Sequence, residues 1–391
     1  MDSKQTYPHP LPSPIIVLGA GCIGLTTAVR LLESGYPVLL LADHLPEDAL
    51  DPRYASTAAG AHFLSFAAND DWRQRFLDQR TFDVLWQESR DPLVAAQIGL
   101  LRLTHTEFYT GGEKHLRCLE QLPDFRVHSS SSLPAFADHS CSFTSLTIEP
   151  TLYLSYLVKR ISSLGGVVAR VHQLSSLTEC CNYARRPLAV VNCSGLGARD
   201  LQDVQDKTVF PVRGQVLSLD APWVKSGWTR QVGSLAGGEG GERTYVIPRV
   251  SGAVIIGGTR EANDWHVASR VETSDDILKR AIEICPQLAH ASGPNSHVDI
   301  KTLVKAEVVG FRPTRQMGIR LEREATSSRN SVPIIHNYGH GGELRVAELV
   351  GMCRRSAASS KRSPSNAYNG SLVALRVDPK ESLPSVLIAR R

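Results

Sequence analysis

The segment Gly19–Gly24 limits the fold of this chain more than any other stretch. It has the sequence Gly-Ala-Gly-Cys-Ile-Gly and directly follows an apolar run at residues 15–18. Apolar residues at helical spacing come next and stop at Gly35, and a second apolar run then ends at Asp43. This order of strand, glycine turn, helix, strand and acid is typical of a βαβ unit that binds a dinucleotide.

The residues of this turn have distinct physical tasks in such a unit. Gly19 permits the tight turn, Gly21 lets the backbone approach a pyrophosphate, and Gly24 lets the helix pack closely on the strand. Free N–H groups at the helix N-terminus can bind the phosphates, and the carboxylate of Asp43 can accept ribose hydroxyls. The turn alone leaves the cofactor open, because NAD and FAD share the ADP half. The predicted cofactor-binding residues of the unit are Gly19, Ala20, Gly21, Cys22, Ile23, Gly24 and Asp43.

Composition places the chain among ordinary soluble enzymes. Its 391 residues are enough for two domains, and 42% of them are hydrophobic and 21% charged. No apolar run reaches the length of a membrane span, and the first 14 residues are polar and proline-rich, without the apolar core of a signal peptide. We therefore expect a soluble, intracellular protein with no membrane partner.

The net charge of +4 does not indicate a nucleic-acid partner. Residues 343–391 hold nine Lys and Arg against four Asp and Glu, so the rest of the chain is close to neutral. No basic face with interleaved aromatic residues accompanies this basic end. The eight cysteines lack the paired spacing of zinc or redox sites, and we expect no metal.

The remaining patterns predict two kinds of sheet. A helix is expected from about Leu152, followed by a strand at residues 167–171 and a second buried strand at residues 188–192. From Phe210 to Thr259 the apolar runs are typical of antiparallel strands. The predicted fold class is α/β, α+β overall, with a Rossmann-like nucleotide-binding domain and a second, mostly antiparallel-sheet domain over a pocket.

Several blocks in this order resemble the D-amino-acid oxidase family of FAD enzymes in its fungal form. The most specific are Gly310–Arg315, with the sequence Gly-Phe-Arg-Pro-Thr-Arg, and Ile334–Gly342, with the sequence Ile-Ile-His-Asn-Tyr-Gly-His-Gly-Gly. Together the matching blocks span about residues 14–342. The others are the glycine turn, Ala58–Ala61, Val190–Gly195, Pro211–Gln215, Tyr245–Pro248, and Gly257–Thr259 before Asp264-Trp265.

The resemblance implies a domain division and a reaction. An FAD-binding domain would be assembled from residues 14–66, 150–205 and 305–342, and a substrate domain from residues 67–149 and 206–304. The reaction would be FAD-dependent oxidative deamination of D-amino acids to 2-oxo acids, with release of ammonia and hydrogen peroxide. It would proceed by hydride transfer from Cα to the flavin, so the partners would be a small D-amino acid and dioxygen.

The same resemblance assigns the catalytic residues. Arg312 would clamp the substrate carboxylate, because a planar guanidinium meets a carboxylate through two parallel charge-assisted bonds. Tyr245 would hydrogen-bond the same group, and the backbone carbonyl of Gly342 would accept from the substrate amine. That grip would hold Cα beside the flavin, where positioning supplies most of what the chemistry needs.

Further FAD contacts are implied along the matched blocks. Arg320 would lie near the flavin ring, where a positive charge stabilises the reduced cofactor, and the glycines around His336 and His340 favour close backbone approach to FAD over a metal site. Val171 and Ser194 are read either as FAD-pocket residues or as plain core. The full implied set is Ser56, Ala59, Gly60, Val171, Ser194, Gly195, Arg320, Gly339 and Gly341.

Substrate preference is left open by the sequence. Family members that act on D-aspartate tend to have Gly-Gly-Thr-Arg where this chain has Gly257–Arg260. Arg260 would then pair with a side-chain carboxylate, assisted by His62, unless Arg260 faces solvent. A D-aspartate oxidase is therefore one alternative. An inactive flavin-binding protein is another, because the end of the chain departs from the family.

After Gly342 the family continues with Tyr-Gly, then Trp-Gly and a helix that covers FAD, and residues 343–352 contain none of these. The segment 343–391 is rich in Ser, Arg and Lys, and we expect it to be disordered. The family is typically peroxisomal, but the ending Ile388–Arg391 is not a peroxisomal address, which leaves a cytoplasmic location as the alternative. A homodimer is also left open.

The coding DNA tests one explanation of this tail. Codons compatible with residues 342–360, read in a shifted frame, can encode Tyr-Gly and Trp-Gly at the family spacing, followed by a helix-like sequence. We predict that the chain after about Gly342 is out of frame. A coding sequence in which no shifted frame yields Tyr-Gly and Trp-Gly at this place would contradict the hypothesis.

Overall fold

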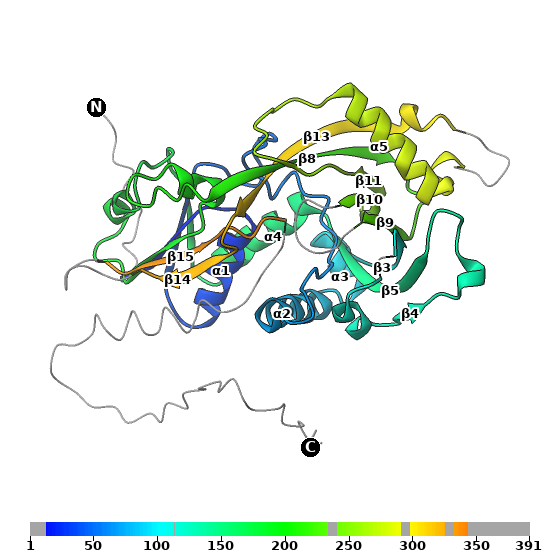
Figure 1. Ribbon diagram of the computed structural model, residues 1–391. Coiled ribbons are helices and arrows are strands. Elements are labelled where there is room, and N and C mark those ends of the chain that lie inside the picture. Colours follow the sequence, from blue (N-terminus) through cyan, green and yellow to red (C-terminus); the bar gives the residue numbers. More distant parts are fainter. Residues whose placement is uncertain (1–12, 113, 234–240, 291–297, 325–331, 343–391) are drawn as a thin grey trace, which may run out of the picture.

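The computed structural model describes residues 13–112, 114–233, 241–290, 298–324 and 332–342 (Figure 1). The predicted atypical tail, residues 343–391, lies outside the described residues. Within the described ranges, no helix is long and apolar enough to cross a membrane. Two β-sheets organise these residues and confirm the predicted α/β class with a second, mostly antiparallel sheet.

The first sheet contains the glycine turn. Six strands of the described chain form it in the order β14-β15-β7-β1-β2-β6, and all pairs are parallel except β14 with β15. Helix α1 (Cys22–Glu33) joins β1 to β2, which confirms the predicted βαβ unit, and packs against α4 (Pro150–Ser163). The strands are β1 (Ile15–Leu18), β2 (Val38–Ala42), β6 (Val167–Arg170), β7 (Ala189–Asn192), β14 (Arg320–Arg323) and β15 (Ile334–Tyr338).

The second sheet is mostly antiparallel, as predicted. Nine strands of the described chain form it in the order β12-β8-β11-β10-β9-β3-β5-β4, with β13 on the other side of β8, and only β3 and β9 pair in parallel. The strands are β3 (Leu100–Thr110), β4 (Arg126–Val127), β5 (His139–Ile148), β8 (Val209–Asp220), β9 (Gly227–Gly233), β10 (Gly241–Pro248), β11 (Ala253–Gly257), β12 (Glu261–Ala262) and β13 (Val304–Arg315).

Helix α5 (Val271–Ile284) covers one face of this sheet. Its apolar residues, such as Ile277, form one buried cluster with Val246 of β10 and Ile256 of β11. Because side chains alternate along a strand, Tyr245 and its neighbours at odd positions of β10 lie on the opposite face. Figure 1 shows α5 beside β8 and β13, while the same sheet continues through β9 and β3 toward α2 (Trp72–Glu88) and α3 (Pro92–Gln97).

The other helices are short or peripheral. Helix α2 (Trp72–Glu88) begins at Asp71, whose carboxylate accepts from the N–H of Gln74, and α3 (Pro92–Gln97) is capped by Asp91 in the same way. Single 3₁₀ turns complete the described chain at Arg117–Gln121, Ser130–Ser132, Thr178–Tyr183, Gly195–Arg199, Pro286–Ala289 and Ile300–Leu303.

Strand β13 joins the two sheets. It pairs with β8 along its length, although we assigned residues 305–342 to the FAD-binding part. At its far end Thr314 forms a bridge with His340, and Pro313 accepts from the N–H of Gly341, just after β15. The chain thus passes from the antiparallel sheet directly to the parallel one. The predicted domain boundaries stay a prediction.

Candidate active site

The glycine turn between β1 and α1 leaves no room for side chains at two positions. Gly19 has φ +107°, and a Cβ there would lie 2.6 Å from the carbonyl oxygen of Cys193. A Cβ on Gly24 would lie 1.9 Å from the carbonyl oxygen of Gly19. Both distances are far below van der Waals contact, so helix α1 can approach β1 and the end of β7 only if these residues are glycine.

Gly21 is less crowded than Gly19 and Gly24. It is the N-cap of α1 and makes no side-chain capping bond, and a Cβ there would lie 3.1 Å from the Oγ of Ser56 and 4.0 Å from a ring carbon of Tyr54. The same Oγ accepts from the N–H of Cys22 at 2.9 Å. The predicted FAD residue Ser56 thus lies at the helix N-terminus, where backbone N–H groups and the helix dipole favour an anion.

The other predicted nucleotide residues lie where parallel strands end. Asp43 directly follows β2, with a side chain 43% exposed, and Val171 directly follows β6 and is buried. Ser194 and Gly195 follow β7, and the Oγ of Ser194 donates to Asn192 at 2.7 Å. Ligands of open α/β sheets bind outside the carboxyl ends of the strands, and these residues share that edge.

Arg320, Gly339 and Gly341 lie at the same edge, near the end of β15. The guanidinium of Arg320 donates to the hydroxyl of Tyr338 at 2.7 Å, and that hydroxyl donates to Asp206 at 2.9 Å. Gly339 and Gly341 have φ of +82° and +62°. Within the described ranges, no group of three His, Cys, Asp or Glu side chains is arranged to hold a metal.

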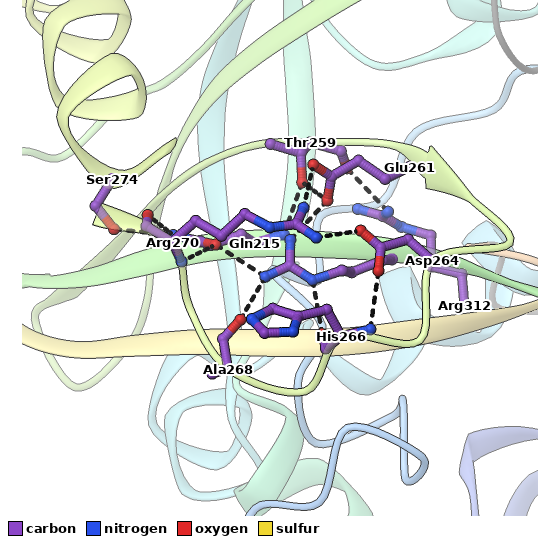
Figure 2. Close-up of polar contacts among 10 residues, drawn as sticks. Gln215, Thr259, Glu261, Asp264, His266, Ala268, Arg270, Ser274 and Arg312 are labelled. Atoms are coloured by element: carbon purple, nitrogen blue, oxygen red, sulfur yellow. Dashed lines mark hydrogen bonds and ion pairs between the residues drawn. The ribbon is translucent and has the colours of Figure 1, made fainter. Parts of the chain in front are cut away.

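Arg312 and Tyr245 meet at one short segment. The Nη1 of Arg312 donates to the carbonyl oxygen of Thr259 at 3.0 Å (Figure 2). A Cβ on the adjacent residue, Gly258, would lie 2.3 Å from the hydroxyl of Tyr245. The guanidinium from β13 and the phenol from β10 therefore converge, although 67 positions of sequence numbering separate them.

Two further predicted residues adjoin this pair. A Cβ on Gly342 would lie 3.3 Å from the Cδ of Arg312, so the backbone of Gly342 lies along the arginine side chain. A Cβ on Gly60 would lie 3.5 Å from the ring of Tyr245, and the carbonyl of the preceding Ala59 accepts from Arg249 at 2.7 Å. The Ser56–Gly60 stretch thus connects the helix N-terminus to the predicted substrate residues.

The structure does not bring Arg260 and His62 together. Arg260 is exposed and precedes β12, at one end of the sheet order, whereas His62 forms a bridge with Thr147 of β5, near the other end. The rings of His62 and His105 are stacked, with their centroids 4.0 Å apart. The Nε2 of His62 is buried without a hydrogen-bond partner in the described chain. Burial holds the pKa of His62 well below its ordinary value, so the ring is neutral at pH 7.

A half-buried cation that we did not select from the sequence lies beside these residues. Arg243 precedes Tyr245 by two positions on β10, so both side chains are on the same face. Its side chain is 12% exposed, and Nη2 lies 2.9 and 3.0 Å from the two oxygens of Glu107. Glu107 is fully buried and also contacts His105 at 3.0 Å. Burial raises the pKa of Glu107, but Arg243 and His105 outweigh this and lower it, so the carboxylate is charged.

Comparison with known proteins identifies the family of the chain. Residues 14–343 match the family described as DAO, FAD dependent oxidoreductase. The chain is 46% identical over 365 residues to a D-aspartate oxidase of Cryptococcus neoformans var. grubii, covering 84% of this chain and 92% of that protein. It is 33% identical over 338 residues to a D-amino-acid oxidase of Schizosaccharomyces pombe, covering 85% and 91%.

Solved structures share the fold at low sequence identity. Glycine oxidase from Geobacillus kaustophilus superposes with a TM-score of 0.64 at 16% identity, covering 90% of this chain and 96% of that one. L-Proline dehydrogenase from P. horikoshii also gives 0.64, at 15% identity, covering 90% and 92%. The glycine turn, the two sheets and the family match lead to one conclusion: the chain belongs to the DAO family of FAD-dependent oxidoreductases.

Proposed function

We propose that this protein oxidises D-amino acids to 2-oxo acids, releasing ammonia and hydrogen peroxide. The observation that carries the proposal is the convergence of the Arg312 guanidinium and the Tyr245 phenol at residues 258–259, with Gly60 of the cofactor stretch against the Tyr245 ring. The names of the relatives, D-aspartate oxidase and D-amino-acid oxidase, support the same reaction class.

The proposed grip follows from the donors at the site. Arg312 uses Nη1 on the carbonyl of Thr259, which fixes the plane of the guanidinium. A substrate carboxylate in that plane can accept two parallel bonds, and the phenol of Tyr245 can donate a third. Three donors define the position of the carboxylate and hence the direction of Cα. We assign the acceptor for the substrate amine to the carbonyl of Gly342, which lies along the Arg312 side chain.

The residues at the sheet edge fit FAD. The turn admits no side chain at Gly19 or Gly24, and Gly21 presents an open helix N-terminus, as a pyrophosphate requires. Ser56 adds a hydroxyl at the same place, and Asp43 is exposed for ribose hydroxyls. When bound, FAD accepts the hydride and passes electrons to dioxygen. The roles of Val171, Ser194, Gly195, Arg320, Gly339 and Gly341 as FAD contacts belong to this proposal.

A preference for acidic D-amino acids is the second candidate, and Arg243 favours it. This cation is half-buried on the face that carries Tyr245, whereas the predicted Arg260 is exposed. A second carboxylate on the substrate could pair with Arg243, and the buried Nε2 of His62 lies in the same cluster through His105. The 46% identical relative is named D-aspartate oxidase, which agrees with this candidate.

The cellular setting is part of the proposal. A peroxisomal location would confine the peroxide that the reaction releases, and it is the location expected from the family resemblance. A homodimer is likewise part of this proposal.

A peroxide assay tests the proposed reaction. Purified full chain with added FAD should produce hydrogen peroxide from D-alanine or D-aspartate and none from the L-isomers. Arg312→Lys keeps the charge but loses the planar fork, so kcat/KM should fall by about 100-fold. Tyr245→Phe removes one donor and should raise KM about tenfold.

The matched control for the tyrosine is Tyr153→Phe on α4. Tyr153 is buried and donates to Glu88 at 2.9 Å, so its loss removes a comparable hydrogen bond away from the site. KM should stay unchanged in this variant. A yellow, FAD-bound chain that makes no peroxide from any D-amino acid would instead support an inactive flavin-binding protein.

Measurements of substrate preference distinguish the proposed role of Arg243 from that of Arg260. Arg243→Met is combined with Glu107→Gln, because removing the arginine alone would leave a buried charge unpaired. We expect KM for D-aspartate to rise about 30-fold or more and KM for D-alanine to change by less than about threefold. Arg260→Met is the comparison variant. If the loss of D-aspartate binding follows Arg260→Met instead, the assignment to Arg243 is wrong.

FAD binding can be tested separately from folding at the glycine turn. Gly21→Ala places its Cβ against side-chain atoms of Ser56 and Tyr54 and against no backbone atom, so the chain should fold, while FAD affinity should drop about tenfold or more because the pyrophosphate loses its close approach. Gly24→Ala should lower the unfolding midpoint even without FAD, because its Cβ would overlap the backbone of Gly19. Flavin fluorescence titration and thermal unfolding of the FAD-free chain measure the two effects. Equal FAD affinity in Gly21→Ala and the unmodified chain would refute the assignment.

A further inference from the structure

A second arginine is buried behind the substrate clamp. Arg213 lies on β8 with a fully buried side chain, and its donors meet four acceptors. Nη1 lies 2.6 Å from Glu261, Nε donates to the carbonyl of His266 at 2.8 Å, and Nη2 donates to the carbonyl of Ala268 at 2.6 Å and to Gln215 at 3.1 Å. A buried guanidinium is costly unless it is paired in this way, so the acceptors must be held in place.

These acceptors belong to the segment that follows β11. Glu261 also pairs with Arg270 at 2.9 Å, and Arg270 pairs with Asp264 at 2.6 Å. The side-chain amide of Gln215 accepts from the N–H of Arg270 and donates to its carbonyl, both at 2.9 Å. Two arginines and two carboxylates balance in charge, and together they fix residues 261–270 against β8 (Figure 2).

This network continues to the clamp through Thr259. The N–H of Gln215 donates to the Oγ1 of Thr259 at 3.0 Å, and the carbonyl of Thr259 accepts from Arg312. Gly214 leaves space for the Arg312 guanidinium, because a Cβ at position 214 would lie 2.6 Å from both terminal nitrogens of Arg312. The guanidinium of Arg312 is therefore enclosed by the β8 backbone on one side and by a carbonyl that the Arg213 network holds on the other.

We propose that Arg213, Glu261 and Thr259 act as positioning residues that orient the Arg312 guanidinium toward the substrate carboxylate. The inference rests on the proposed function, since it assigns the carboxylate to Arg312. The network acts through Arg312 and does not contact substrate. Its loss should weaken carboxylate binding for every substrate alike, whatever the side chain.

The test uses the full chain with FAD and the variants Thr259→Val and Glu261→Gln. Thr259→Val keeps the shape and the backbone carbonyl but removes the acceptor for Gln215. We expect KM for each D-amino acid, and Kd for benzoate as a simple carboxylate probe, to rise about tenfold, with kcat changed by less than about twofold. Glu261→Gln should do the same, because it leaves Arg213 without its carboxylate.

Glu283→Gln is the matched control, because it removes the partner of Arg230 at 2.9 Å on the same sheet without contacting Arg312. It should leave KM for each D-amino acid and Kd for benzoate unchanged. If Thr259→Val and Glu261→Gln lower only the unfolding midpoint and leave Kd for benzoate unchanged, the network is merely structural and the inference is wrong. If the unmodified chain neither binds benzoate nor oxidises any D-amino acid, the proposed function fails, and this inference fails with it.

Discussion

The position of the Arg312 guanidinium depends on the pairing of β8 and β13, and most of the candidate site depends on that position. Arg312 pairs with Val212 across the two strands, and its terminal nitrogens lie against the backbone of Gly214. A residue with a side chain at position 214 would displace the arginine. Because β8 also pairs with β11 and β12, the same strand sets the place of Thr259 between them. The position of Arg312 is thus determined by strand pairing within the sheet and not by a loop.

Alternation along the strands decides which residues can reach this clamp. Val246 and Ile256 are fully buried with α5, and burying such side chains stabilises the fold by about 1.5–3 kcal/mol each. A slip of one residue in β10 would expose this apolar face and place Arg243 and Tyr245 under the helix. The hydrophobic face therefore fixes the register, and the register determines that Tyr245 points toward Arg312. Stability and the proposed substrate contact of Tyr245 are therefore coupled through one strand.

The local structure, such as the βαβ unit, could be predicted from the sequence, but the long-range pairing of strands could not. The glycine turn and its flanking apolar runs follow rules of short range, and the structure confirms the βαβ unit they predict. The pairing of β13 with β8 joins segments about 100 residues apart, and no periodicity encodes that choice. Arg243 was missed because it directly follows a glycine-rich run and lies outside the apolar part of β10. Arg260 was chosen for its neighbours in sequence, yet the chain leaves it exposed.

The charge state of the Arg243 cluster bears on how one pocket could serve different D-amino acids. A lone buried arginine would lose its hydration without compensation and would exclude an apolar substrate side chain. Here Glu107 balances Arg243, and the lowered pKa values of His62 and His105, caused first by burial, keep both rings neutral. When the substrate side chain is neutral, the charges of Arg243 and Glu107 already balance each other. A substrate carboxylate would add a negative charge to a neutral group of partners, and protonation of the buried His62 ring would compensate for that charge. Binding of an acidic substrate would then be favoured as the pH falls toward the pKa that His62 has in the complex, whereas binding of a neutral one would not depend on this ring.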